Sequence, residues 1–147
     1  MTIEHEELAA LLPQKGKMFL IGRIPEVKPE EWSIESETEI SENFMFYEKS
    51  VEGVPNYVCI EMIAQTVAAL TGISAKKNNL PGNIGFILSV SNLSFDFDII
   101  KCGQKVGIKA VREAVVENVH SFKAEVFLDG KLKGSGKLTA MEAKNRE

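Results

Sequence analysis

The segment that most constrains the fold is residues 54–70, with the sequence VPNYVCIEMIAQTVAAL. We predict a helix that runs from here to residue 79, because Lys76 and Lys77 suit a helix C-terminus and Pro81 follows. Pro55 suits the first helical turn, where a missing N–H costs nothing. Apolar residues cover nearly every side of this helix, so we expect it to be buried rather than laid on a surface.

A single carboxylate, Glu61, stands among these apolar residues. Gln65 lies four residues later and shares a helix face with Glu61, and Ala68 and Gly72 leave room beside that face. Burial of an ionised carboxylate is costly, and a carboxyl in that position usually titrates nearer neutrality, as a general acid or base requires. A partnered core acid, or a carboxylate facing a solvated cleft or a subunit interface, explains the same pattern without catalysis.

The other segments predict one antiparallel sheet. Residues 32–40 alternate between two faces, which is typical of a half-buried strand: one face holds Trp32, Ile34, Ser36, Thr38 and Ile40, and the other holds Ser33, Glu35, Glu37 and Glu39. Asp129-Gly130 separates two alternating segments and predicts a β-hairpin. Further strands are expected at residues 18–27, 84–97, 105–119, 121–128 and 131–141, with a short helix at 3–12 and a loop at 41–54. This order predicts a single α+β domain over residues 1–147, with the sheet wrapped around the long helix.

Composition narrows the class of protein. A chain of 147 residues buries roughly 70% of its unfolded surface and needs no disulfide or metal to hold a core. The net charge of −4 argues against nucleic acid, and Cys59 and Cys102 form neither a pair motif nor a zinc spacing. The N-terminus lacks a basic signal-peptide region, and no apolar run reaches the roughly 18 residues of a membrane span. We therefore expect a cytoplasmic protein that uses no metal or redox cofactor.

Three segments carry a family resemblance. Residues 11–24, LLPQKGKMFLIGRI, resemble an opening motif that reads L-L-P-H-R-x-P-[FM]-L-L-[VI]-D-R-[VI]. Residues 54–70 resemble the helix motif P-G-V-L-x-x-E-x-[ML]-A-Q, and both the proline-to-glutamate spacing and the Glu-x-x-x-Gln pair fit. Residues 95–110, FDFDIIKCGQKVGIKA, resemble a strand–turn–strand motif. Together the three resemble the 3-hydroxyacyl-acyl carrier protein dehydratases of the hotdog fold, over nearly the whole chain.

The detailed pattern resembles a branch of this family that is associated with aryl-polyene gene clusters. Residues 44–65, FMFYEKSVEGVPNYVCIEMIAQ, carry that likeness. The family pairs the helix acid with a histidine in an H-F-P-G loop, but Tyr47 holds that place here and the loop contains no histidine. Other departures are Gln14 for the histidine of the opening motif, Gly22 for its aspartate and Asn56 for the glycine after the helix proline. The chain's two histidines, His5 and His120, fall on no motif, and His120 is expected to be solvated beside a turn.

The resemblance implies roles for particular residues. Glu61 and Gln65 would orient and protonate the leaving hydroxyl of a 3-hydroxyacyl thioester, while another group removes the α-proton. The backbone N–H groups of Asn56 and Tyr57, next to Pro55 at the start of the helix, would polarise the thioester carbonyl. Tyr47 is a poor base but a plausible hydrogen-bond donor, and it equally suits an aromatic lining of the acyl tunnel or the dimer seam. Phe86 and Leu88 would line the acyl pocket or belong to ordinary sheet core.

Three functions fit these residues. The first is a (3R)-hydroxyacyl-acyl carrier protein dehydratase of fatty acid or polyene biosynthesis. The second is a catalytically inactive subunit that supports an active homologue, as the absent loop histidine suggests. The third is an acyl thioesterase, which needs only a carboxylate on this helix and a water.

The expected partners follow from the same resemblance. They are an acyl carrier protein or a coenzyme A thioester, and a second copy of the chain in a homodimer or higher homo-oligomer, or a homologous subunit. An acidic carrier protein needs a basic docking site. Its candidate residues are Lys15, Lys17, Arg23, Lys76, Lys77, Lys101 and Lys105, although scattered solvated lysines are the commoner case.

Overall fold

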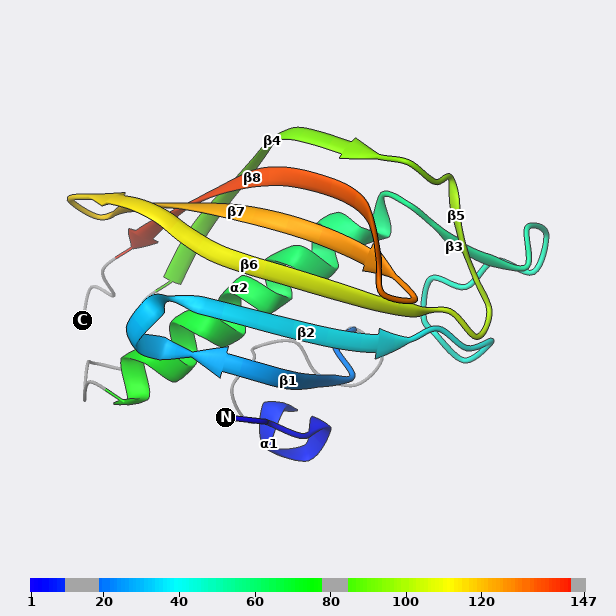
Figure 1. Ribbon diagram of the computed structural model, residues 1–147, viewed down its shortest axis with the longest axis horizontal. Coiled ribbons are helices and arrows are strands. Elements are labelled where there is room, and N and C mark those ends of the chain that lie inside the picture. Colours follow the sequence, from blue (N-terminus) through cyan, green and yellow to red (C-terminus); the bar gives the residue numbers. More distant parts are fainter. Residues whose placement is uncertain (10–18, 78–84, 144–147) are drawn as a thin grey trace.

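The computed structural model describes residues 1–9, 19–77 and 85–143, and it places one long helix against a curved sheet (Figure 1). The helical elements are α1 (His5–Ala9), the 3-10 helix η2 (Pro29–Glu31) and α2 (Val58–Lys77). The strands are β1 (Arg23–Lys28), β2 (Ser33–Glu39), β3 (Gly53–Pro55), β4 (Gly85–Phe95), β5 (Ile99–Lys101), β6 (Lys105–Val116), β7 (Val119–Leu128) and β8 (Lys131–Ala143). None of the described helices is long and apolar enough to cross a membrane.

The main sheet is antiparallel and has the strand order β1-β2-β6-β7-β8-β4. Two short strands, β3 and β5, form a separate antiparallel pair. The predicted hairpin is confirmed, because Leu128 of β7 pairs with Lys131 of β8 across Asp129 and Gly130. Both turn residues have positive φ, 49° and 83°, as a tight hairpin turn requires.

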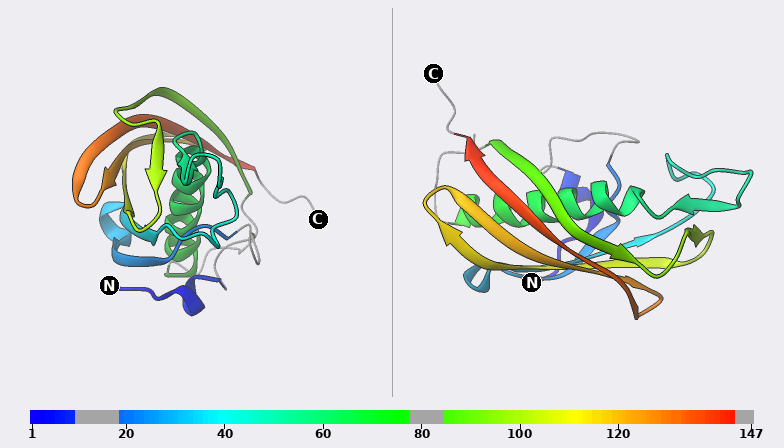
Figure 2. Two further views of the ribbon diagram at one scale, coloured as in Figure 1. Left: turned by 90° about the vertical axis from the view of Figure 1, so that its right-hand side faces the viewer. Right: turned by 90° about the horizontal axis from the view of Figure 1, so that it is seen from above.

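The core lies between the concave face of the sheet and α2. Along β7 the buried positions alternate with more exposed ones, so one face of the strand packs on the helix. The largest fully buried side chains include Met62, Ile63 and Leu70 of α2, which meet residues such as Ile108 and Phe122 of the sheet. Figure 2 shows the sheet curving around the helix, as the sequence predicts.

The long helix differs from the prediction at its start. It begins at Val58 rather than at Pro55, because Pro55 and Val54 belong to β3 and pair with Ile99 and Ile100. Pro55 is therefore a buried strand residue and not the first residue of a helical turn. The helix ends at Lys77, and the predicted extension to residue 79 lies outside the described residues.

The N-terminal elements also differ from the prediction. The first helix begins at His5 rather than at Ile3, since the backbone of Ile3 forms a β-bridge with Ile24. Its predicted continuation over residues 10–12 lies outside the described residues. The first strand covers Arg23–Lys28 only, and residues 19–22 before it have no regular structure.

Most of α2 is buried, as the sequence predicts, but one stripe of the helix is not. Ile60 is 37% exposed, and Tyr57, just before the helix, is 60% exposed. Ala64 and Ala68, one and two turns after Ile60, are partly buried. The stripe continues the line of small residues that the sequence places beside Glu61, and it leaves that side of the helix accessible.

Candidate functional site

Glu61 lies in the first turn of α2 and borders the open stripe. Its side chain is partly buried, between the alternatives of a core acid and a carboxylate in a solvated cleft. Its Oε1 accepts a hydrogen bond of 3.2 Å from Nε2 of Gln65. Among the described residues, the Oε2 atom of Glu61 has no hydrogen-bond or ion-pair partner. One carboxylate oxygen is thus held by the helix, and the other is available to a ligand.

Gln65 fixes the orientation of that carboxylate. Its side chain is fully buried, and its Oε1 accepts a hydrogen bond of 2.9 Å from the backbone N–H of Leu20. A carboxamide has its acceptor on one side and its donors on the other, so the bond from Leu20 turns Nε2 toward Glu61. The predicted pairing of the two residues on one helix face is confirmed, and Leu20 is a participant that sequence analysis missed.

Asn56 connects the start of the helix to the β4–β5 connection. Its backbone N–H donates to the carbonyl of Asp98 at 2.9 Å, and its Nδ2 donates to the carbonyl of Phe97 at 2.8 Å. The Asn56 N–H is therefore occupied and cannot be a free donor for a thioester carbonyl. In the described part of the chain the backbone N–H groups of Tyr57 and Val58 make no hydrogen bond, so they remain as donors.

Tyr47 lies in the loop between β2 and β3, with its ring packed against the edge of the core. Partial desolvation raises the pKa of its phenol, and negative charge at Cys102, Glu42 and Glu52 raises it further. A phenol with a raised pKa stays protonated at neutral pH, so Tyr47 can donate a hydrogen bond but is a poor base.

Phe86 and Leu88 lie on β4, at the edge of the main sheet. Their backbones pair with Glu142 and Ala140 of β8. Their side chains lie outside what the structure describes, and their place in an acyl pocket stays a prediction.

His120 corrects a prediction. It lies in β7, its side chain is only 4% exposed, and its Nδ1 lies 3.4 Å from Nη1 of Arg112. The Arg112 guanidinium stacks 4.0 Å from the ring centre of Trp32, and burial lowers the pKa of this guanidinium. Because arginine can only donate, Nδ1 of His120 accepts and its ring proton sits on Nε2. The expected solvated histidine is instead a buried residue in contact with the partly buried Trp32 and Arg112, and we call the three residues the Trp32–Arg112–His120 cluster.

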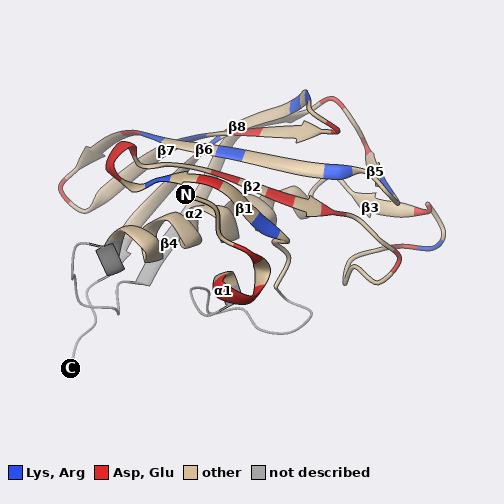
Figure 3. Ribbon diagram, turned by 60° about the horizontal axis from the view of Figure 1, so that its bottom comes forward, with Lys and Arg blue, Asp and Glu red and all other residues tan. Residues whose placement is uncertain are grey.

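Acidic positions along β2 lie beside basic positions on the neighbouring strands β1 and β6 (Figure 3). Glu37 of β2 contacts Lys105 of β6 at 3.3 Å and Arg23 of β1 at 3.6 Å, and Arg23 also contacts Glu4. Two of the predicted docking cations, Arg23 and Lys105, are thus engaged with carboxylates. Four others, at positions 15, 17, 76 and 77, have side chains outside what the structure describes.

A long helix wrapped by a curved antiparallel sheet defines the hotdog fold, and solved structures share it. The dehydratase heterocomplex ApeI:P from Xenorhabdus doucetiae superposes with a TM-score of 0.83 at 18% identity, covering 94% of this chain and 91% of that chain. A hypothetical thioesterase with coenzyme A from Streptococcus pneumoniae superposes with a TM-score of 0.62 at 10% identity, covering 84% of this chain and 87% of that one.

Sequence comparison narrows the fold to a family. Residues 6–147 match the family model ApeP-like, which is described as ApeP dehydratase. The 3-hydroxyacyl-[acyl-carrier-protein] dehydratase FabZ of Streptococcus thermophilus is 31% identical over 143 residues, covering 95% of this chain and 96% of the relative. The chain belongs to the ApeP-like dehydratase family, and the resemblance seen in the sequence is confirmed.

Proposed function

We propose that this chain takes part in the dehydration of a 3-hydroxyacyl thioester held on an acyl carrier protein, with Glu61 as its acid. The observation that carries the proposal is the state of Glu61, with one oxygen held by Gln65 and the other without a partner among the described residues. The FabZ relatives, whose name specifies 3-hydroxyacyl-[acyl-carrier-protein] as substrate, support the substrate class. Coenzyme A thioesters are the alternative carrier.

The chemistry assigns one step to each group. A base removes the α-proton next to the thioester carbonyl, and the electron pair forms the new double bond as the C3–O bond breaks. The Glu61 carboxyl gives its proton to the leaving hydroxyl, so the products are a 2-enoyl thioester and water. The N–H groups of Tyr57 and Val58 are placed at the start of α2, where a helix favours the negative charge that develops on a thioester oxygen.

The α-proton base is not among the loop residues of this chain. No histidine lies between residues 41 and 54, His120 belongs to the buried cluster, and His5 bonds the backbone of the segment before β1. We propose that a second chain covers the open stripe of α2 and supplies the base. The exposed Ile60 and Tyr57 support such an interface, and the ApeI:P structure is itself a heterocomplex of this fold. A homologous subunit with a loop histidine is the candidate for supplying the base, because a second copy of this chain would bring the same loop without one.

The test is hydration of an enoyl thioester, which is monitored through the loss of the absorbance of its conjugated double bond. The purified chain is assayed alone and with a homologous dehydratase, and Glu61→Gln is the matched control because it keeps the shape and removes the titrating proton. We expect hydration that falls by about 100-fold or more in Glu61→Gln. Equal rates in both proteins would overturn the role of Glu61.

Two alternatives make different predictions in the same assay. If the chain is an inactive partner subunit, which the missing loop histidine favours, the homologue gains stability or activity on mixing and Glu61→Gln changes neither. If the chain is a thioesterase, which the coenzyme A-bound structural neighbour favours, the assay releases free thiol from a saturated acyl thioester. A thiol reagent in the mixture separates this outcome from hydration.

A further inference from the structure

Segment 20–22 lies directly before β1 and has no regular structure, yet it contacts the candidate site. The backbone N–H of Leu20 is the donor that orients Gln65, and Gln65 in turn holds Glu61. The position of a backbone N–H depends on what holds its own segment. Whatever fixes segment 20–22 therefore also determines where the Glu61 carboxylate points.

Thr38 of β2 holds this segment from the side of the sheet. Thr38 is 6% exposed, and its hydroxyl donates to the carbonyl of Leu20 at 3.2 Å and accepts from the N–H of Gly22 at 3.1 Å. These two hydrogen bonds hold the peptide groups before and after Ile21 in place. A hydroxyl has a single proton, so these two bonds fix the rotation of the Thr38 side chain as well.

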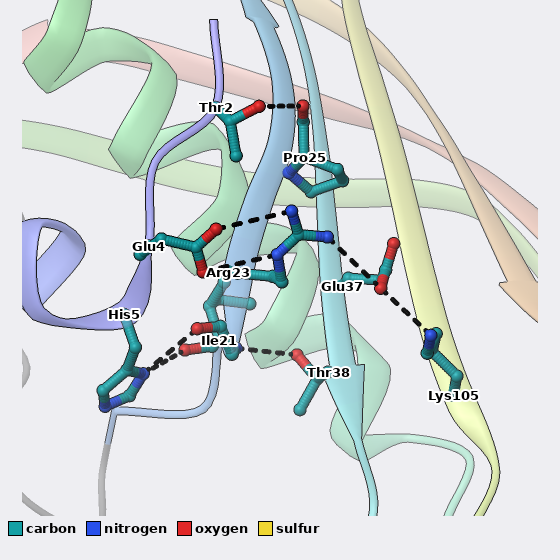
Figure 4. A network of polar contacts seen from close by, with 10 residues as sticks. Thr2, Glu4, His5, Ile21, Arg23, Pro25, Glu37, Thr38 and Lys105 are labelled. Carbon is teal, nitrogen blue, oxygen red and sulfur yellow. Dashed lines mark hydrogen bonds and ion pairs between the residues drawn. The ribbon is translucent and has the colours of Figure 1, made fainter.

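Two further features keep segment 20–22 against β2. A Cβ atom at Gly22 would lie 2.7 Å from the backbone oxygen of Glu37, so only glycine allows this close approach. On the opposite side, Nδ1 of His5 lies 3.1 Å from the carbonyl oxygen of Ile21 and 3.2 Å from that of Gly22. Figure 4 shows His5 and Thr38 on opposite sides of the segment.

We infer that Thr38 is a positioning residue for Glu61, acting through segment 20–22 and Gln65 without touching the substrate. The inference rests on the proposed function, since it supplies the orientation that Glu61 needs as an acid. Loss of the Thr38 hydroxyl releases Leu20, and the Leu20 N–H then no longer holds the Gln65 amide in the orientation that donates to Glu61. The Glu61 carboxyl can still donate a proton, but its orientation is no longer fixed.

The first measurement is the hydrogen-exchange rate of the Leu20 amide, which NMR records in three variants. Thr38→Val removes the hydroxyl and keeps the branched shape, and we expect Leu20 to exchange at least about tenfold faster and the Gln65 side-chain resonances to shift. Thr38→Ser keeps the hydroxyl and should restore both to within about threefold. Ser36→Ala is the matched control, because Ser36 is buried two residues away on β2 but bonds Thr66 rather than segment 20–22.

Each result decides the inference. If the exchange rate of the Leu20 amide is the same in Thr38→Val as in Ser36→Ala, the Thr38 hydroxyl does not specifically position segment 20–22, and the inference is wrong. If Thr38→Val does not fold, the wild-type protein provides the test through a scalar coupling across the Leu20 N–H to Gln65 hydrogen bond and a slowly exchanging Thr38 hydroxyl proton near the Gly22 amide. Absence of either signal overturns the inference.

An activity assay separates positioning from a merely structural role. In hydration of an enoyl thioester we expect Thr38→Val to lower kcat about tenfold with KM within about twofold, and Thr38→Ser to recover the rate. Ser36→Ala should keep the wild-type kcat. An inactive wild-type protein would refute the proposed function alone, because the exchange measurement still judges the link from Thr38 to Gln65.

Discussion

Two polar groups lie against the core near opposite ends of α2, and they differ in how they are enclosed. Glu61 in the first turn is partly buried, and one of its carboxylate oxygens has no partner in the described part of the chain. His120 is the second residue of β7, a strand that starts toward the other end of α2 in Figure 1, and it is 4% exposed beside Arg112 and Trp32.

The difference shows which polar group supports the fold and which is available for chemistry. A buried ring that is stacked and hydrogen-bonded within the chain stabilises a packing arrangement, and removing it costs stability. A carboxylate that is oriented by one bond and open on its other oxygen contributes little to stability and retains capacity for a ligand. The contacts of a titratable residue therefore indicate its role better than its residue type does.

Replacement of His120 should have the largest effect on stability. We expect His120→Ala to lower the free energy of unfolding by about 2–4 kcal/mol, because it leaves a cavity beside Trp32 and removes the acceptor of Arg112. Urea denaturation measures the loss, and Lys123→Ala, exposed on the same strand, should change it by less than about 0.5 kcal/mol. Activity per folded molecule should stay at the wild-type level, and a loss of activity without a loss of stability would show that His120 acts in the chemistry rather than in the fold.

Gln65 contributes both to stability and to the orientation of Glu61, so its replacement should affect both properties. Gln65→Leu leaves the buried N–H of Leu20 without its acceptor and should cost about 1–3 kcal/mol of stability. It also removes the donor to Glu61, so enoyl hydration should fall in the same variant. Thr71→Val is the control on the same helix, since among the described residues that hydroxyl bonds only the carbonyl of Ala68. Loss of stability with full activity would show that Glu61 needs no orientation.

Much of the fold could be predicted because its signals are local. The apolar segment at 54–70 indicated the central helix, strict alternation indicated β2, and the Asp129-Gly130 pair indicated the hairpin. The Glu61–Gln65 pair followed from helix spacing alone. These features depend on neighbours a few residues away, which a sequence displays directly.

The errors arose where distant segments meet. Pro55 looked like a helix start, but pairing with Ile99 places it in a strand. His120 looked like a turn residue, yet β7 turns it inward toward Arg112. The role of Leu20 could not be predicted, because its contact with Gln65 spans 45 residues and uses a backbone N–H that every residue carries. The alternation of residues 119–128, with His120 in phase with Phe122 and Ala124, was the one signal that could have placed the histidine inside.

The two faces of α2 also differ at the first turn, where thiol chemistry can compare them. Cys59 is fully buried on the core side, and burial raises the pKa of its thiol to about 12, whereas Cys102 is exposed in the turn before β6. A disulfide reagent should therefore modify one thiol per native chain and two in denaturant. Mass spectrometry of Cys102→Ser should find no rapid modification. Rapid modification of Cys59 would mean that the core side of the helix opens as readily as the Glu61 side.

The smallest effect is expected from Tyr47, whose phenol could contribute only a hydrogen bond. Because the pKa of this phenol is raised in the folded protein, the folded state favours its neutral form, and stability should decline as the pH rises past about 10. Tyr47→Phe should remove that decline and lower enoyl hydration by less than about tenfold at neutral pH. The phenolate absorbance lost in Tyr47→Phe gives the Tyr47 titration directly, with a midpoint expected above about 10. A loss of about 100-fold, together with activity that rises with pH in the wild type alone, would make Tyr47 the α-proton base and remove the need for a second chain to supply one.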